Sequence, residues 1–291
     1  MLSSACDQAT AVKVVTVRLP GTCGEWVQGT LDGVPCLVSC AIDWHAQATV
    51  TADGRGVWHL PADAPKAVAA LRLALAARDS TGASGVLRLN NPLPRGRGYA
   101  SSTADVAGTI YAVGQAVGWP FTPAEVAQLA VQVEPSDSTI FPTLTLFAHR
   151  DASFYRPLPP LPPLAVVVLD PGGTVDTLAF NAVDHSAVLH RAAAAHRDAF
   201  ARFEAGLAAG DVVEIARAAT ASAVIHQAIL PDPLVDAALA AHLSLGALGI
   251  CRAHSGTLVG LLCRPEAADE VAQRARLHFR DTTVRVHHCL G

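Results

Sequence analysis

The sequence predicts an α+β fold built on antiparallel sheets, and two observations support this class. Strand-like and helix-like segments are interleaved along the 291 residues, without an internal repeat. Short apolar runs joined by tight polar turns indicate hairpins, which favours this class over a doubly wound parallel sheet. Five prolines within residues 156–163 forbid a helix there. We therefore expect an N-terminal lobe over 1–156, a stiff connector over 157–163 and a C-terminal lobe over 164–291.

The composition excludes several classes of protein. With 51% apolar and 16% charged residues the chain can bury a core, and no apolar run approaches the roughly 20 residues of a membrane-spanning helix. The net charge of -4 provides no positive field for nucleic acid or an anionic membrane, so we expect neither partner. Seven scattered cysteines, and no signal-peptide pattern in the first residues, indicate reduced thiols and a cytoplasmic location. The oligomeric state is left open.

In the first half, residues 12–19 read as a strand that Pro20-Gly21 is expected to end. Further strands are expected in the apolar or alternating segments 36–42, 46–50, 86–89 and 139–147. Helices are predicted at 65–78, from 102 onward, and from a Thr122–Glu125 capping box to Glu134, where Pro135 follows.

In the second half, the β-branched run 164–169 predicts a buried strand. Two segments, 249–253 and 258–263, indicate a hairpin with a polar tip at 254–257. Alanine-rich helices are expected at 183–209, 211–228 and 233–245, with a further helix at 265–279 and a last strand at 283–287.

A glycine-containing loop that leads directly into a helix, at residues 94–105, is the most informative segment. Gly96 and Gly98 lack a Cβ, so the backbone can bend there and approach a ligand closely. The unpaired amides and the dipole at the start of the helix favour an anion such as a nucleotide's phosphates. The hydroxyls at 101–103 can reach a phosphate or a hydrated Mg²⁺. A mobile loop with serine caps remains the alternative, because the spacing fits neither the Walker A nor the dinucleotide pattern.

A pair of carboxylates, Glu134 and Asp137, follows the capping-box helix. Two nearby carboxylates attract a divalent cation, and a carboxylate can align and deprotonate an attacking hydroxyl. The alternative is a helix ended by Pro135, with Asp137 capping the next turn.

Three other polar segments are read with both a functional and a structural alternative. Residues 20–29 and 252–257 are either ordinary turns or parts of a site. Cys23 has no indicated histidine partner, which argues against a nucleophile. Cys36 and Cys40, followed by His45, could be metal ligands, but their place in an apolar segment favours buried thiols.

Taken together and in this order, these segments resemble the GHMP kinases, the superfamily of galactokinase, homoserine kinase and mevalonate kinase. The segment Pro94-Arg95-Gly96-Arg97-Gly98-Tyr99-Ala100-Ser101-Ser102-Thr103-Ala104 is similar to the family's PxxxGLGSSA phosphate loop. Residues 254–257 stand where the family has its third, glycine-bearing motif. Residues 20–29, 37–44 and 134–141 look like the L-threonine kinase branch, which makes L-threonine O-3-phosphate for the aminopropanol linker of cobalamin. The similarity spans most of residues 14–290.

The resemblance implies a two-lobed fold, with an N-terminal lobe similar to the second domain of ribosomal protein S5 and a ferredoxin-like C-terminal lobe. The small-molecule substrate L-threonine would lie between them with ATP and Mg²⁺. Glu134 and Ser102 would hold the metal, and Asp137 would orient, and deprotonate, the hydroxyl. The ATP phosphates would contact Pro94, Arg95, Gly96, Arg97, Gly98, Tyr99, Ala100, Ser101, Ser102 and Thr103. The amino acid would contact Thr22, Glu25, Ser255 and Gly256.

Two departures from the family pattern affect these expectations. Tyr99-Ala100 replaces the usual Leu-Gly, which makes the loop bulkier and one glycine poorer. The spacing from Glu134 to Asp137 is shorter than in mevalonate kinase, so the metal ligand and the base of that enzyme need not correspond one to one to Glu134 and Asp137. Two alternatives to a threonine kinase stay open: a kinase of another hydroxylated substrate such as homoserine, and a nucleotide-binding protein without transfer activity.

Overall fold

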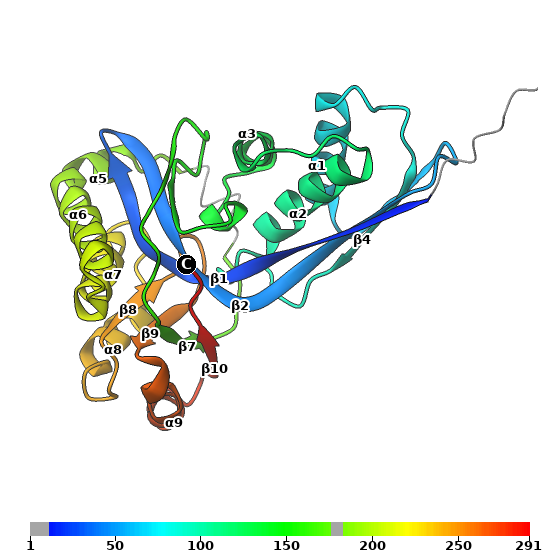
Figure 1. The fold of residues 1–291 in the computed structure, drawn as a ribbon. Coiled ribbons are helices and arrows are strands. Elements are labelled where there is room, and N and C mark those ends of the chain that lie inside the picture. The colour runs from blue at the N-terminus through cyan, green and yellow to red at the C-terminus, as the bar shows by residue number, and fades with distance from the viewer. Residues whose placement is uncertain (1–11, 176–182) are drawn as a thin grey trace, which may run out of the picture.

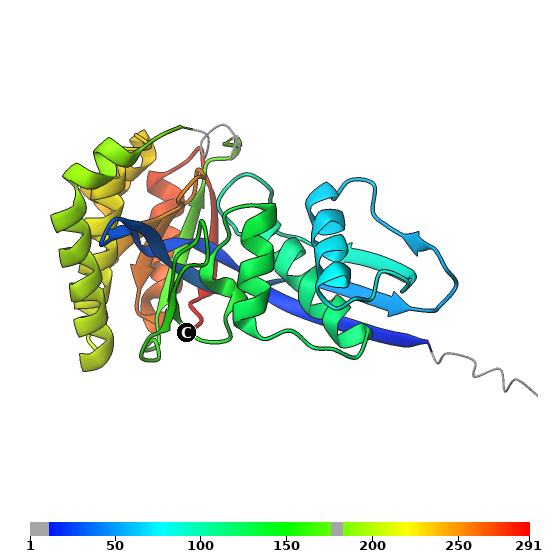
Figure 2. The ribbon, with the colours of Figure 1, turned by 90° about the horizontal axis from the view of Figure 1, so that it is seen from above.

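The fold is organised around one long β-hairpin. The computed structural model describes residues 12–175 and 183–291. Strand β1 (Lys13–Leu31) and strand β2 (Val34–Ala52) pair antiparallel along nearly their whole length. Asp32 and Gly33 join them, and both have positive φ, as a tight hairpin turn of two residues requires. Figures 1 and 2 show the two strands running from one end of the molecule to the other.

A single sheet connects the two halves of the chain. In the described residues the strand order is β10-β7-β9-β8-β1-β2-β4-β3, and off this path β5 pairs with β2 and β6 pairs with β5. The junction is narrow, because β1 pairs with β8 only at Glu25 and Arg252. The strands not yet located are β3 (Trp58–His59), β4 (Gly85–Asn90), β5 (Thr145–Phe147), β6 (Tyr155–Pro157), β7 (Ala165–Asp170), β8 (Gly249–Arg252), β9 (Val259–Cys263) and β10 (Thr283–His288).

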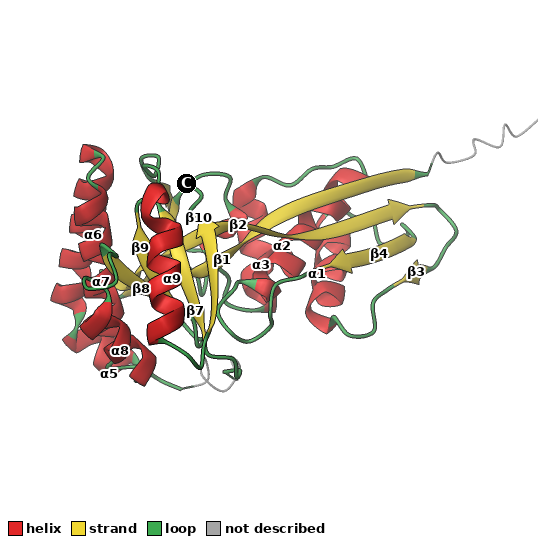
Figure 3. Cartoon of the chain, turned by 90° about the horizontal axis from the view of Figure 1, so that it is seen from below, coloured by secondary structure: helices red, strands yellow, loops and turns green. Residues whose placement is uncertain are grey.

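Helices cover the sheet in separate groups (Figures 1 and 3). Helices α1 (Pro65–Ala77), α2 (Ser101–Ala116) and α3 (Pro123–Val133) share a core with β2 and β4. At the other end of the hairpin lie α5 (Ser186–Arg191), α6 (Ala193–Ala209) and α7 (Val212–His226). Helices α8 (Pro233–Ala241) and α9 (Ala268–His278) pack on β7, β8 and β9.

The β-branched run in β7 is buried on both of its faces, as predicted. Val166 and Val168 belong to the central core, which contains residues of β1, β2, α6 and α7. Val167 and Leu169 point the other way, into the core beneath α8 and α9. This period-two alternation explains why the strand is apolar at every position from Ala165 to Leu169 rather than at every second one.

Several predicted strand boundaries are wrong. Pro20-Gly21 does not end the first strand, because β1 continues through it by way of register irregularities between Pro20 and Val27. The expected strands 36–42 and 46–50 are one strand, β2. The expected strand 139–147 is a 3₁₀ turn at Ser138–Ile140 followed by the three residues of β5. The first two errors share a cause, since a register irregularity keeps a strand in its sheet where local turn signals predict an end.

The predicted helix boundaries agree with the structure better than the predicted strand boundaries do. The Thr122–Glu125 capping box is present with both of its hydrogen bonds, and α3 ends at Val133 with Glu134 as its C-cap. The expected helix 183–209 starts beside the undescribed residues 176–182 and is interrupted at Ala192. The expected helix 265–279 begins with a 3₁₀ turn at Pro265–Ala267. None of the described helices has the length and hydrophobicity needed to cross a membrane.

Phe203 should contribute strongly to stability, because it joins the two halves of the chain in the central core. Its ring on α6 stacks on Trp26 of β1 at a centroid distance of 5.9 Å, and both side chains are fully buried. Phe203→Ala is expected to lower the free energy of unfolding by about 3–5 kcal/mol, measured by urea denaturation. Leu243→Ala, at a side chain 73% exposed, is the control and should change it by less than about 0.5 kcal/mol. If Phe203→Ala and Leu243→Ala lowered the free energy of unfolding by the same amount, this packing would be contradicted.

Candidate active site

The predicted loop bends sharply into the start of α2. Gly96 and Gly98 have φ values of 70° and 104°, and Ala100 has φ 58°, so three of these residues are in the left-handed region. Ala100 is the N-cap, and α2 begins at Ser101. A left-handed alanine costs on the order of 1–3 kcal/mol, which the contacts of the loop must offset. The unpaired amides at the positive end of α2 therefore face the same space as the hydroxyls of its first turn.

Close packing against the tip of the β8–β9 hairpin requires glycine in the loop. A Cβ on Gly98 would lie 2.4 Å from the Cβ of Ala253, and a Cβ on Gly256 would lie 2.2 Å from the carbonyl oxygen of Arg97. The backbone amides of Thr257 and Leu258 both donate to that same carbonyl. The hairpin tip predicted at 254–257 thus supports the loop from the C-terminal half.

The irregular part of β1 supports the loop from the other side. The amide of Thr22 donates to the carbonyl of Tyr99 (3.1 Å), and the Thr22 hydroxyl donates to that of Gly98 (2.9 Å). The amide of Gly24 also donates to Gly98. The irregular residues of β1 therefore donate three hydrogen bonds to the backbone of the loop.

Two carboxylates contact successive residues in the first turn of α2. The Ser102 hydroxyl donates to Glu134 Oε1, and the Thr103 hydroxyl donates to Asp137 Oδ2 at 2.8 Å. The second Glu134 oxygen pairs with Lys66 Nζ at 2.5 Å. The Pro135 turn after α3 thus places Glu134 and Asp137 side by side, and Lys66 supplies a positive charge beside them.

These groups enclose a cavity of about 310 Å³. Thr22, Arg97 and Gly256 are outside its wall and contact the loop backbone or Asp170 instead. The roles predicted for individual residues remain predictions. The predicted residues that line it are Glu25, Pro94, Arg95, Gly96, Gly98, Tyr99, Ala100, Ser101, Ser102, Thr103, Glu134, Asp137 and Ser255.

Burial raises the pKa of two carboxyl groups in the cavity. The pKa of Glu25 lies well above its ordinary value, because the side chain is buried and the charge of Asp137 is near. The pKa of Asp137 is also raised, first by burial and then by the charge of Glu134, although the hydrogen bond from Thr103 opposes this. A base with a raised pKa is better matched to accepting a proton near neutral pH.

Comparison with known proteins fits this geometry. The family model of the GHMP kinases N-terminal domain matches residues 66–141, and that of the GHMP kinases C-terminal domain matches 203–281. The L-threonine kinase of Salmonella typhimurium is 31% identical over 93% of this chain and 90% of its own length. The L-threonine kinase of Citrobacter freundii is 32% identical over 86% of each chain.

The chain belongs to the GHMP kinase family. The crystal structure of homoserine kinase from Cytophaga hutchinsonii superposes with a TM-score of 0.72 at 19% identity, covering 95% of this chain and 94% of the other, which shows a shared fold. The expected α+β GHMP kinase fold is therefore confirmed. As a GHMP kinase, the protein is a phosphotransferase with an alcohol acceptor that takes its phosphate from ATP.

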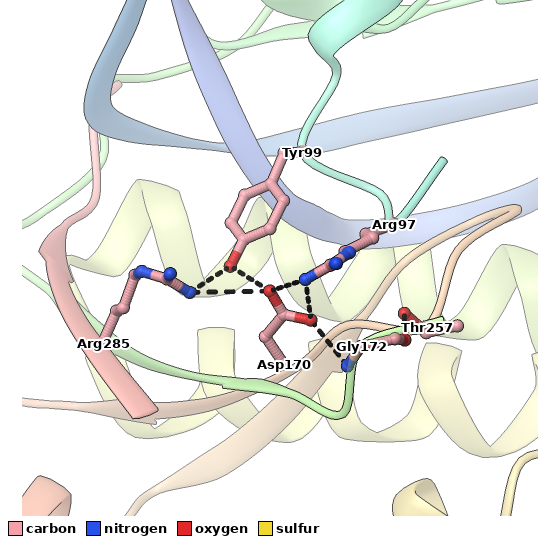
Figure 4. Close-up of polar contacts among 6 residues, drawn as sticks. All are labelled: Arg97, Tyr99, Asp170, Gly172, Thr257 and Arg285. Carbon is pink, nitrogen blue, oxygen red and sulfur yellow. Dashed lines mark hydrogen bonds and ion pairs between the residues drawn. The ribbon is translucent and has the colours of Figure 1, made fainter. Parts of the chain in front are cut away.

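The tyrosine that departs from the GHMP loop pattern has a definite partner. The Tyr99 hydroxyl donates to Asp170 Oδ2 at 3.2 Å, and Asp170 is itself completely buried at the end of β7. Arg97 donates to both carboxylate oxygens (3.2 and 3.0 Å), and Arg285 of β10 reaches the same group at 3.5 Å. Figure 4 shows the four side chains converging, with the amide of Gly172 completing the set. The loop of this GHMP kinase is thus anchored through side chains on the C-terminal half.

Among the residues of the site that the sequence does not predict, three position its loop and carboxylates. Lys66 stands in the first turn of α1 as an isolated lysine without a motif. The Asn91 side chain donates to the carbonyl of Ser101 and to Asp105, which fixes the start of α2; the Asn-Pro turn after β4 was its one available signal. Asp170 follows a buried strand and precedes Pro171, where a turn residue is the ordinary interpretation.

None of the cysteines in the described residues lines the cavity. Cys23 is fully buried, and contact with Cys251 together with burial raises the pKa of its thiol, so it is not a nucleophile. Cys36 and Cys40 are buried free thiols, as expected. Within the described ranges no group of three or more histidine, cysteine or acidic side chains could hold a metal ion.

Asp170→Asn tests the anchor of the loop. It removes the charge that Arg97, Tyr99 and Arg285 share, and we expect the free energy of unfolding to fall by about 1.5–3 kcal/mol, measured by urea denaturation. Asp198→Asn is the matched control, because Asp198 pairs with Arg202 on the surface of α6. That change should cost less than about 0.5 kcal/mol. A loss at Asp170 no larger than the control would show that the cluster does not hold the loop.

Proposed function

We propose that the protein transfers the γ-phosphoryl group of ATP to the side-chain hydroxyl of L-threonine, giving L-threonine O-3-phosphate. The observation that carries this is the pairing of Glu134 with Ser102 and of Asp137 with Thr103 at the start of α2. The substrate assignment draws on the L-threonine kinases that match nearly the whole chain. Such a product would supply the aminopropanol linker of cobalamin.

The phosphates would lie along the loop, on the amides of the first turn of α2. A serine hydroxyl and a glutamate oxygen fit Mg²⁺, which takes hard oxygen ligands and usually retains phosphates and water as well. Ser102 and Glu134 would therefore hold a Mg²⁺ ion, which neutralises phosphate charge when bound. Lys66 lies beside Glu134 and adds a positive charge at the same place. Phosphoryl transfer depends mainly on such positioning and charge neutralisation.

Asp137 would orient the threonine hydroxyl toward the phosphate. The Asp137 carboxylate keeps one hydrogen bond from Thr103, which fixes its direction. Its raised pKa suits it to accept the hydroxyl proton as the new bond forms. Glu25 and Ser255 line the same cavity and would contact the amino acid, whereas Thr22 and Gly256 would shape the cavity through the loop.

Activity measurements on a substrate panel test this function. With Mg-ATP, coupled ADP release should be seen with L-threonine and be weaker with L-serine, homoserine and mevalonate.

Asp137→Asn should lower kcat by about 10²–10⁴-fold, as expected for loss of a positioned base. Glu134→Gln should raise the Mg²⁺ concentration needed for activity. Glu125→Gln, in the capping box of α3, is the control and should retain turnover. A wild type that phosphorylates no amino acid would disprove the proposal.

Glu25→Gln tests the electrostatics of the cavity. Above the ordinary pKa of glutamate the unfolded chain loses this proton while the folded chain keeps it, so the free energy of unfolding falls as pH rises toward the raised pKa. Glu25→Gln removes this proton and should make the decline in stability from pH 5 to pH 8 shallower in urea denaturation. Glu266→Gln on the surface should leave the slope unchanged. An unchanged slope in Glu25→Gln would contradict the raised pKa.

A further inference from the structure

One buried histidine in the cavity wall has no role in the proposed chemistry. His149 follows β5 and is 3% exposed, and neither of its ring nitrogens has a hydrogen-bond partner among the described residues. Its ring lines the 310 Å³ cavity and also a second, adjoining cavity of about 520 Å³. Leaving a buried polar group unpaired is costly, so a ring held in this way at a cavity wall points to a ligand.

The backbone places His149 next to the catalytic loop. Its carbonyl accepts a hydrogen bond from the amide of Ser136 at 2.9 Å, and Ser136 precedes Asp137. Glu25 and Asp137 line the same cavity as the His149 ring. A small molecule whose hydroxyl is held at Asp137 therefore lies in the same cavity as this ring.

The cavity wall combines carboxyl groups with imidazole rings. The carboxyl groups are those of Glu25, Glu134 and Asp137. The rings of His149 and His254 meet edge to face at 4.9 Å, and Arg150 lines the second cavity with them. An amino acid in its zwitterionic form can use both kinds of group, because its ammonium donates hydrogen bonds and its carboxylate accepts them.

Burial keeps the two rings neutral, and each can still donate a hydrogen bond. Burial, followed by the charge of Arg150, lowers the pKa of His254 to about 3, and burial lowers the pKa of His149 well below its ordinary value. Each neutral imidazole has one N–H to donate. The ring of His254 is held by Gln28 Oε1 at 2.6 Å from its Nδ1, which leaves His149 as the ring whose donor has no protein acceptor among the described residues.

We infer that His149 binds the α-carboxylate of the amino-acid substrate through a ring N–H, while Glu25 in the same cavity wall accepts a hydrogen bond from the ammonium group. This inference rests on the proposed function and extends it, since it makes His149 the residue that distinguishes amino acids from other small alcohols. Ser255 lies in the same wall and is placed to contact the carboxylate as well.

Removing the carboxylate from the substrate and the ring from the protein tests this contact. Wild-type kcat/KM should be about 10- to 100-fold higher for L-threonine than for L-threoninamide, the ratio expected for one hydrogen bond to a charged group. In His149→Ala, the kcat/KM for L-threonine should fall, through a higher KM, to the value that the wild type has for L-threoninamide. The variant should then no longer prefer L-threonine over the amide. The KM for ATP should stay the same, and His149→Asn, which keeps an N–H donor, should restore part of the preference.

The control is His196→Ala, which removes a buried histidine that lines neither cavity and contacts Thr30. It should keep the wild-type preference for L-threonine over the amide. A preference that survives intact in His149→Ala, with wild-type turnover normal, would overturn the role of His149 and leave the proposed function standing. No turnover of any amino acid by the wild type would overturn both.

Discussion

The whole site depends on two carboxylates being held against the positive end of one helix. Glu134 and Asp137 contact adjacent residues in the first turn of α2, so their charges face the amides that begin the helix. Like charges this close in a buried cavity repel each other, and the raised pKa of Asp137 is partly the result. Lys66 offsets one charge, and the hydroxyls of Ser102 and Thr103 hold both groups in place. A phosphate chain with its divalent cation matches this arrangement. The negative phosphates suit the helix amides, and the positive cation suits the carboxylates.

The rest of the fold serves to keep the loop before α2 bent. Its carbonyls at Gly98 and Tyr99 accept hydrogen bonds from the irregular part of β1, and the carbonyl of Arg97 accepts them from the β8–β9 tip. The buried carboxylate of Asp170, at the end of β7, forms an ion pair with Arg97 and accepts a hydrogen bond from Tyr99. The loop is therefore fixed by segments from both halves of the chain, which meet in one continuous sheet. A shift between the halves would change the loop and the cavity together.

The sequence predicts best those parts of the site whose partners are near in the chain. The glycine bends, the start of α2 and the capping box of α3 depend on local conformation, and each is found where expected. At Pro20-Gly21 the local sequence predicts the end of a strand, because the donors that follow are satisfied by a loop nearly 80 residues away. The same limit applies to Asp170, Lys66 and His149. Each acquires its role only through long-range contacts, and each is an ordinary residue in its local sequence.

A structure of the protein crystallised with Mg²⁺, a non-hydrolysable ATP analogue and L-threonine tests this account most directly. It should show the metal bound by Ser102 and Glu134 and bridging the phosphates over the start of α2. The threonine hydroxyl should lie between Asp137 and the terminal phosphate. A nucleotide bound elsewhere, or a Glu134 side chain turned away into solvent with nucleotide in place, would contradict it.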